Sequence, residues 1–169
     1  MIWLLTLLLL AAPADELPEM IPLSELPTTG KPAADFSLPL FSGGTFKLSA
    51  QRGKPVIISF WASWCGPCRE ELPELNRFAN KRKDVVVVAV NTDRNRSAGE
   101  RFYKELKLTL PAVYDENSAA ISNYDVETFP TTYVIDQQGT VVLRSSGYNS
   151  KYGLKPLFNF VNRLQGKQR

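Results

Sequence analysis

The sequence contains no histidine and only two cysteines among its 169 residues. Without an imidazole, the chain cannot form a Ser-His-Asp or Cys-His nucleophilic system, and it lacks the histidine ligands of the common catalytic zinc sites. Two cysteines are also too few for a Cys₄ zinc site or for an iron–sulfur cluster held by one chain. The chemistry must therefore come from carboxylates, lysines, tyrosines, hydroxyls or the two thiols.

A strong excess of one charge is also missing. The 20 Lys and Arg against 17 Asp and Glu give a net charge of +3, which does not by itself indicate a nucleic-acid partner. The hydrophobic fraction of 44% and the charged fraction of 22% are ordinary for a globular protein, and the length suits one domain with a substantial core. We therefore expect a single folded domain with no nucleic-acid partner, no metal and no bound cofactor.

Apolar residues fill the N-terminal segment 2–12, which contains no charged side chain. This run is shorter than the roughly 20 residues that cross a bilayer, and Ala12-Pro13-Ala14 offers the small residues of a signal-peptidase site. Because Lys and Arg are missing before the run, an uncleaved membrane anchor is the alternative. Five prolines between positions 13 and 32 predict an extended, semi-rigid stretch. We accordingly divide the chain into a signal peptide at 1–14, a Pro-rich leader at 15–32 and a folded domain at 33–169.

The pattern of apolar residues in the folded part predicts an α/β domain. Alternating segments at 35–40 and 45–48 flank Ser42-Gly43-Gly44 and predict a β-hairpin. The apolar runs 56–61 and 85–90 are typical of strands buried on both faces of a sheet, and the helical pattern at 69–81 joins them into a βαβ unit. We expect further strands at 112–114, 132–135 and 140–143, and helices at 97–106, 119–124 and from Pro156 onward, with Ser97 and Ser118 as N-caps. Together these elements predict a mixed central sheet with helices on both faces, an N-terminal hairpin and a helical insertion.

Cys65 and Cys68 lie directly after the first buried run, at the start of the predicted helix. Free backbone N–H groups and the helix dipole stabilise a thiolate there, so we expect a lowered pKa at Cys65, the more exposed of the two. Two intervening residues let the sulfurs close a small ring, which Pro67 stiffens. Half of a zinc site and a structural disulfide are weaker alternatives, and c-type haem needs a histidine where Arg69 stands. We interpret the pair as redox-active.

The segment Trp61-Ala62-Ser63-Trp64-Cys65-Gly66-Pro67-Cys68 resembles the active site of thioredoxins. More narrowly, the chain from about Ala33 to Leu164 resembles the exported thiol–disulfide oxidoreductases of the TlpA/ResA type. The supporting features are the hairpin at 35–48, Gly53-Lys54-Pro55, the run from Arg69 to Leu75, and Phe129-Pro130-Thr131-Thr132 before the strand Tyr133-Val134-Ile135-Asp136. The resemblance implies a thioredoxin-like fold and thiol–disulfide exchange.

The resemblance also implies roles for individual residues. Cys65 corresponds to the nucleophile that attacks a substrate disulfide, and Cys68 to the thiol that resolves the mixed disulfide. Pro130 is expected to follow a cis peptide bond, and the backbone of Phe129 to pair with the substrate chain. Trp64 flanks the sulfurs, although an aromatic lid on the core explains it equally well. The residues expected to contact substrate are Trp64, Gly66, Pro67, Phe129 and Pro130.

A carboxylate near the thiols is the remaining candidate for proton transfer. Typical thioredoxins carry a buried Asp at the position of Ser59, so the sequence departs from them there. The TlpA/ResA type often carries a Glu three residues after the second Cys, and Glu71 matches it. A spacing of three places Glu71 on the helix face of Cys68, where a half-buried carboxyl would have a raised pKa and could exchange a proton with that thiol. The alternative is a solvated side chain, as we expect for Glu70 and Glu74.

One small departure from the TlpA/ResA type concerns Tyr124-Asp125-Val126. Relatives commonly have glycine in the middle of this segment, where the chain takes a left-handed conformation. Asp tolerates that conformation better than most residues do. We therefore expect Asp125 to be left-handed and the fold to be retained.

The leading functional hypothesis is a thiol–disulfide oxidoreductase of the periplasm that reduces disulfides of other proteins, for example in cytochrome c maturation. Its partners would be thiol- or disulfide-containing proteins and a membrane electron donor of the thiol–disulfide type, because the periplasm is oxidising. A disulfide-forming oxidant is the alternative within the same chemistry. A peroxiredoxin-type peroxidase usually has a proline ahead of its cysteine that residues 60–64 lack, and a thioredoxin-fold metallochaperone uses wider cysteine spacing and a histidine.

Overall fold

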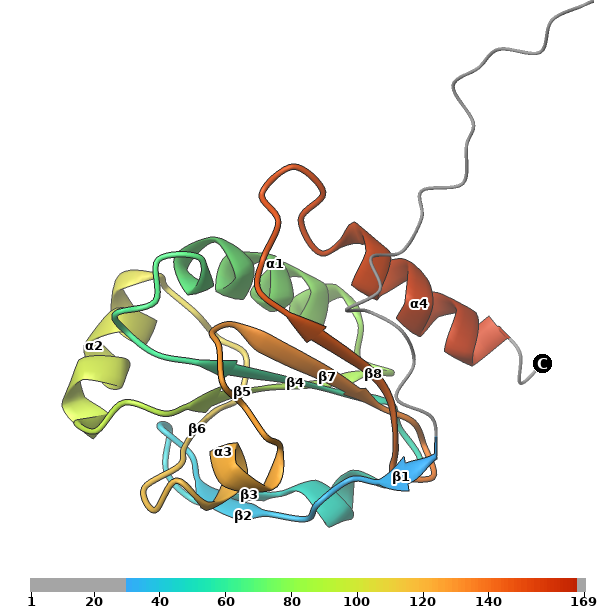
Figure 1. The fold of residues 1–169 in the computed structure, drawn as a ribbon, viewed down its shortest axis with the longest axis horizontal. Helices are drawn as coiled ribbons and strands as arrows, with labels where there is room; N and C mark the ends of the chain where they lie inside the picture. The colour runs from blue at the N-terminus through green and yellow to red at the C-terminus, as the bar shows by residue number, and fades with distance from the viewer. Residues whose placement is uncertain (1–29, 167–169) are drawn as a thin grey trace, which may run out of the picture.

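The computed structural model describes residues 30–166 of the chain. The predicted signal peptide and nearly all of the predicted leader lie outside these residues. Within them, one six-stranded sheet with the strand order β1-β8-β7-β4-β5-β6 is the centre of the molecule, and a separate two-stranded hairpin accompanies it (Figure 1). None of the helices in residues 30–166 is long and apolar enough to cross a membrane.

The six-stranded sheet contains both parallel and antiparallel strand pairs. Strands β4, β5 and β6 are parallel, whereas β7 pairs antiparallel with β4, β8 with β7, and β1 with β8. The sheet strands are β1 (Lys31–Pro32), β4 (Val56–Trp61), β5 (Val86–Asn91), β6 (Ala112–Tyr114), β7 (Thr131–Ile135) and β8 (Thr140–Ser146), and the hairpin is β2 (Ser37–Pro39) with β3 (Thr45–Lys47). The helices are α1 (Cys68–Lys81), α2 (Arg96–Glu105), α3 (Ala119–Asn123) and α4 (Lys155–Gly166).

Two apolar cores cover the two faces of the sheet. Side chains of α1, α2 and α4, such as Leu72, Phe102 and Val161, pack on one face. The hairpin and α3 cover the other face, where Phe46 and Ala120 are buried. Figure 1 shows the same division, with α1 and α4 above the sheet and α3 with the hairpin below it. The thioredoxin-like arrangement predicted from the sequence, with helices on both faces and an N-terminal hairpin, is therefore confirmed.

Strand β4 lies in the interior of the sheet, and every one of its residues is buried. This burial explains its nearly continuous apolar sequence, in which Ser59 is the one polar residue, because a strand covered on both faces does not alternate between polar and apolar residues. The chain then crosses over through α1 to β5, and the apolar side of α1 faces the sheet. The loop between β4 and α1, which carries the cysteines, consequently starts at a rigid point in the core.

The helix caps differ from those predicted. Asn95, not Ser97, caps α2, since its side chain accepts a hydrogen bond from the backbone N–H of Ser97 at 2.9 Å. Ser118 precedes α3 in a left-handed conformation and makes no capping bond. Instead, the Asp115 carboxylate accepts hydrogen bonds from the first N–H groups of α3, including that of Ile121 at 2.8 Å. A charged acceptor binds orphan N–H groups more strongly than a hydroxyl does.

The bounds of strands β1, β7 and β8 differ from the prediction, and the backbone of Asp125 agrees with it. Lys31 and Pro32, which fall in the predicted leader, pair with β8 as the edge strand of the sheet. Strand β8 extends to Ser146, three residues beyond the predicted end, and β7 begins at Thr131. Asp125 has a φ of 47°, so the expected left-handed conformation is confirmed.

Candidate active site

Cys65 and Cys68 form a disulfide in which the two Cα atoms lie 5.4 Å apart. Cys65 lies in the loop after β4, and α1 begins at Cys68, with Pro67 at the N-cap position. The backbone N–H of Cys68 points to the Sγ atom of Cys65 at 3.2 Å. Cys65 is 5% exposed whereas Cys68 is fully buried, as expected for an attacking and a resolving thiol. The free N–H groups at the start of α1 would stabilise a thiolate on Cys65 in the reduced protein.

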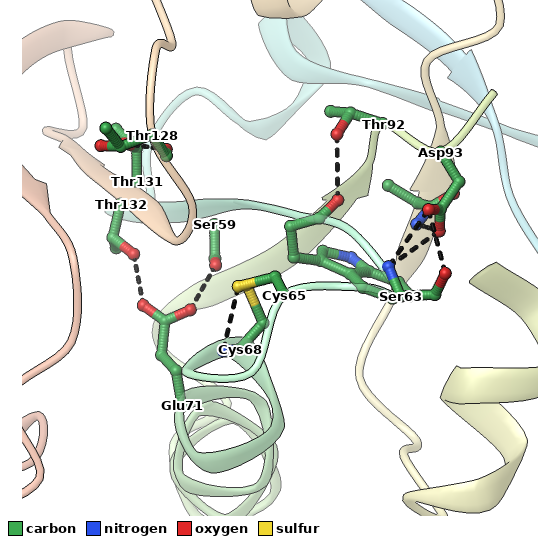
Figure 2. Close-up of a disulfide and its surroundings, with 12 residues drawn as sticks. Ser59, Ser63, Cys65, Cys68, Glu71, Thr92, Asp93, Thr128, Thr131 and Thr132 are labelled. Atoms are coloured by element: carbon green, nitrogen blue, oxygen red, sulfur yellow. Dashed lines mark hydrogen bonds between the residues drawn. A yellow bond between two sulfur atoms is a disulfide. The ribbon is translucent and has the colours of Figure 1, made fainter.

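A buried carboxylate fixes the loop just before the cysteines. Asp93, which follows β5, accepts hydrogen bonds from the backbone N–H of Ser63 at 3.0 Å, from the Ser63 hydroxyl at 3.0 Å and from the Asn91 amide at 2.8 Å (Figure 2). Gly99 of α2 packs so closely on Asn91 that a Cβ atom there would lie 2.4 Å from its Oδ1. This network anchors Ser63, two residues before Cys65, to the end of β5. Asp93 was not predicted as a site residue, and the signal in the sequence is its position two residues after a parallel strand.

Three of the residues expected to contact substrate are exposed neighbours of Cys65 in the chain. Gly66 and Pro67 are exposed, and Trp64 is 71% exposed, the one large hydrophobic side chain in residues 30–166 with this exposure. Its ring packs edge-on against Phe129 with the centroids 5.4 Å apart. Trp64 is therefore not a lid on the core, which removes that alternative.

The peptide bond between Phe129 and Pro130 is cis, as the resemblance predicts. Pro130 is buried and Phe129 is partly exposed, at the turn that leads into β7. Phe129 and Trp64 together form an apolar rim beside Cys65. The structure thus brings together residues from two loops that are far apart in the sequence.

Glu71 is buried within the core at 1% exposure, on the first turn of α1. Its Oε2 accepts a hydrogen bond from the Ser59 hydroxyl at 2.7 Å, and its Oε1 accepts one from the Thr132 hydroxyl at 2.6 Å (Figure 2). Burial raises the pKa of Glu71 to about 7, and the nearby Glu74 adds to the rise while the two hydroxyls oppose it. The expected half-buried position is therefore an underestimate, and the solvated alternative is wrong.

Glu74 also differs from its expected solvated state. Its carboxylate is partly buried and accepts hydrogen bonds from the Tyr148 hydroxyl at 2.8 Å and from the backbone N–H of Leu154 at 2.9 Å. Burial, together with the neighbouring Glu74, raises the pKa of Tyr148 to about 12. Glu74 thus anchors the segment that connects β8 to α4. Glu70, by contrast, is exposed as expected.

Comparisons with known proteins agree with this geometry. The profile of the AhpC/TSA family matches residues 29–144. The thiol-disulfide oxidoreductase ResA of Geobacillus kaustophilus is 37% identical over 114 residues, which are 66% of this chain and 66% of that protein. The thioredoxin-like protein YneN of Bacillus subtilis is 35% identical over 116 residues, 66% of this chain and 68% of that protein.

Solved structures of proteins with similar names have a similar fold. A DsbE-type thiol:disulfide interchange protein from Chlorobium tepidum has a TM-score of 0.75 at 33% identity, over 80% of this chain and 96% of that one. The pneumococcal exposed lipoprotein thioredoxin Etrx1 from Streptococcus pneumoniae has a TM-score of 0.68 at 30% identity, over 77% of this chain and 99% of that one. The fold is thus similar to that of a protein named for thiol:disulfide interchange and of one named a thioredoxin.

The burial of Glu71 predicts a pH-dependent stability of the oxidised protein. The pKa of its carboxyl is raised from 4.5 in the unfolded chain to about 7 in the folded protein, so the folded state binds this proton more tightly. Its contribution to the free energy of unfolding is therefore complete below pH 4.5 and falls by about 3 kcal/mol as the pH rises through 7. Urea unfolding at a series of pH values measures the decline.

Glu71→Gln should remove this part of the pH dependence, because the amide does not titrate. Glu70→Gln is the matched control, since it removes a carboxyl one residue away that is exposed. A decline of equal size in the wild type and in Glu71→Gln would contradict the prediction.

Proposed function

Since the chain belongs to the AhpC/TSA family and is a thiol–disulfide oxidoreductase with the thioredoxin-like fold, we propose that it reduces disulfides of other proteins outside the cytoplasm. The observation that carries the proposal is the arrangement of the two cysteines. Cys65 keeps 5% of its surface exposed beside an apolar rim, whereas Cys68 is fully buried at the start of α1, whose first turn also carries the buried Glu71.

The proposed reaction begins at Cys65. Its thiolate attacks one sulfur of a substrate disulfide, a mixed disulfide forms, and the other substrate sulfur leaves as a thiolate. The N–H group of Cys68, 3.2 Å from the Cys65 sulfur in the oxidised protein, and the start of α1 favour the negative charge on this thiol. The exposed rim of Trp64 and Phe129 gives the substrate chain an apolar surface beside the reacting sulfur.

Resolution of the mixed disulfide is the task of Cys68. Its thiol must lose a proton before it attacks the Cys65 sulfur and releases the second substrate thiolate, which leaves the Cys65–Cys68 disulfide. Glu71 is the proposed acceptor of this proton. Its pKa of about 7 lies in the range in which a carboxyl takes up and returns protons readily, and it stands one helical turn from Cys68.

The partners follow from the same chemistry. The substrates are proteins with accessible disulfides, for which the apolar rim provides binding surface, and cytochrome c precursors are one such class. After each turnover the protein holds an oxidised pair, so a second thiol–disulfide partner must reduce it. Because extracytoplasmic compartments are oxidising, we infer that this electron donor is a membrane protein.

The direction of electron flow can be tested by the reduction potential of the Cys65–Cys68 couple. Equilibration of the protein with glutathione or dithiothreitol buffers, followed by thiol titration, should give about −250 mV or lower, in the range of reducing thioredoxins. A value near about −120 mV, as for the strong oxidant DsbA, would support the disulfide-forming alternative. Rapid peroxide consumption by the reduced protein would support the peroxidase alternative instead.

The role of Glu71 can be tested with a chromogenic disulfide such as 5,5′-dithiobis(2-nitrobenzoate). The reduced protein should release two thiolates, the first on attack by Cys65 and the second on resolution by Cys68. Glu71→Gln should slow the second release by about 100-fold at neutral pH, because general base catalysis is lost, and should leave the first nearly unchanged. In Glu70→Gln both releases should match the wild type. An unchanged second release in Glu71→Gln would exclude the proton step.

Export can be tested on the full-length chain in a bacterial host. The protein should be recovered from the extracytoplasmic fraction, and its intact mass should correspond to an N-terminus at Asp15 if the signal is cleaved after Ala14. Ala14→Phe should then prevent cleavage, because the peptidase requires a small residue there. Retention of Met1 in the membrane fraction would indicate the uncleaved anchor, whereas soluble full-length protein in the cytoplasm would contradict export.

A further inference from the structure

Two hydroxyl groups from neighbouring strands hold the buried carboxyl of Glu71. Ser59 on β4 and Thr132 on β7 are direct partners in the antiparallel ladder, so their side chains leave the sheet on the same face. Each hydroxyl binds a different oxygen of Glu71, at 2.7 Å and 2.6 Å. All three residues are buried. Figure 2 shows the carboxyl between the two hydroxyls, next to the disulfide.

The charged and titratable groups around Glu71 determine how much the two hydroxyls contribute to stabilising its ionised form. Among the described residues, the charged or titratable groups that interact with Glu71 are Glu74 on the same helix and Tyr148 from the segment after β8. Glu74 opposes a second negative charge, and Tyr148 is a neutral phenol whose hydroxyl already binds Glu74. Strands β4 and β7 present only the two hydroxyls to the carboxyl. The hydrogen bonds of Ser59 and Thr132 are therefore the side-chain contacts that favour the ionised carboxylate, in addition to the positive end of the α1 dipole, because Glu71 lies in the first turn of that helix.

Hydroxyls suit a group that changes its protonation state. A hydroxyl can donate one hydrogen bond and can also accept, and its hydrogen rotates freely. Both hydroxyls can donate to the ionised carboxylate, and one can turn to accept from the O–H of the protonated acid. A buried amide or a buried cation would match only one of the two states well. Each oxygen of the Glu71 carboxyl can thus keep a hydrogen-bond partner through rotation of a hydroxyl while a proton is gained or lost.

We propose that Ser59 and Thr132 are positioning residues that keep the Glu71 carboxyl in place beside Cys68 in both protonation states, and thereby set the pH at which Cys68 resolves the mixed disulfide. This inference rests on the proposed role of Glu71 as the proton acceptor. Neither residue touches a reacting sulfur in the interactions that the structure shows. Their effect is exerted through the carboxyl alone.

The direct test is a titration of Glu71 in the oxidised protein by ¹³C NMR of labelled Glu carboxyls, with the resonance assigned by its loss in Glu71→Gln. Ser59→Ala and Thr132→Val each remove one donor to the charged form, so each should raise the midpoint by about 1 pH unit or more. Thr132→Ser keeps the hydroxyl and should restore the wild-type midpoint. Thr131→Val is the matched control, because the Thr131 hydroxyl is bound to the Thr128 carbonyl, away from Glu71.

The second test is the pH dependence of the rate of the second thiolate release from the chromogenic disulfide, which reports resolution by Cys68. In Ser59→Ala and Thr132→Val its midpoint should move to higher pH by the same amount as the NMR midpoint. In the Glu71→Gln background the same two substitutions should have no further effect on the profile. Thr131→Val should leave the profile where it is in the wild type.

The two tests separate the possible failures. If the NMR midpoint of Glu71 stays within about 0.3 pH unit of the wild type in both variants, or moves equally in Thr131→Val, the positioning role is overturned. If the NMR midpoint moves but the kinetic profile does not, the hydroxyls hold the carboxyl without setting the rate, which also overturns the proposal. If Glu71→Gln itself leaves resolution unchanged, the proposed role of Glu71 fails and this inference fails with it.

Discussion

The pairing of β4 with its two neighbours is the constraint on which the whole site depends. Strand β4 is buried along its length between β5 and β7. Its end at Trp61 pairs with Asn91 of β5, and from there Asp93 reaches across to fix the loop that leads to Cys65. On the other side, the register with β7 sets Ser59 opposite Thr132 and places the cis-Pro130 turn at the same end of the sheet. A slip of one residue in either ladder would turn these side chains to the opposite face.

The buried carboxyl shows a conflict between stability and chemistry. Within residues 30–166, no cation is among the groups that interact with Glu71, and the carboxyl is buried in the core, so its ionisation at neutral pH is unfavourable. An apolar residue of similar size would pack in this position without that penalty. A titratable group in such a position is typical of functional sites, where the pKa is shifted toward the pH of the reaction. The location of Glu71 one helical turn from Cys68 is where the proposed proton transfer needs a titratable group, and that role would account for the penalty.

Much of this arrangement could be predicted from the sequence. Some elements followed from local periodicity, others followed from motifs, and a few features could not be predicted. The strands β4 and β5 and the helix α1 were found because their apolar periodicity is local information. The cysteine pair and the cis-Pro130 followed from motifs. For Glu71, the spacing from Cys68 predicted a half-buried carboxyl, but its full burial did not follow from α1 alone, because the depth of burial depends on how the sheet packs against the helix. The caps by Asn95 and Asp115 were missed because Ser97 and Ser118 fit the local pattern equally well, and only the backbone conformation distinguishes them.

The residue types at positions 59 and 71 depend on each other. Typical thioredoxins carry their buried carboxylate on the strand, at the position of Ser59, whereas here the carboxyl comes from α1. Two carboxyls in this space would repel each other, and one would be forced to stay protonated. The short Ser59 side chain leaves room for Glu71 and supplies a hydrogen bond to it. Because Glu71 and Cys68 both lie on the first turn of α1, the backbone of one short helical segment sets the distance between the carboxyl and the sulfur, and no second element has to be positioned to bring them together.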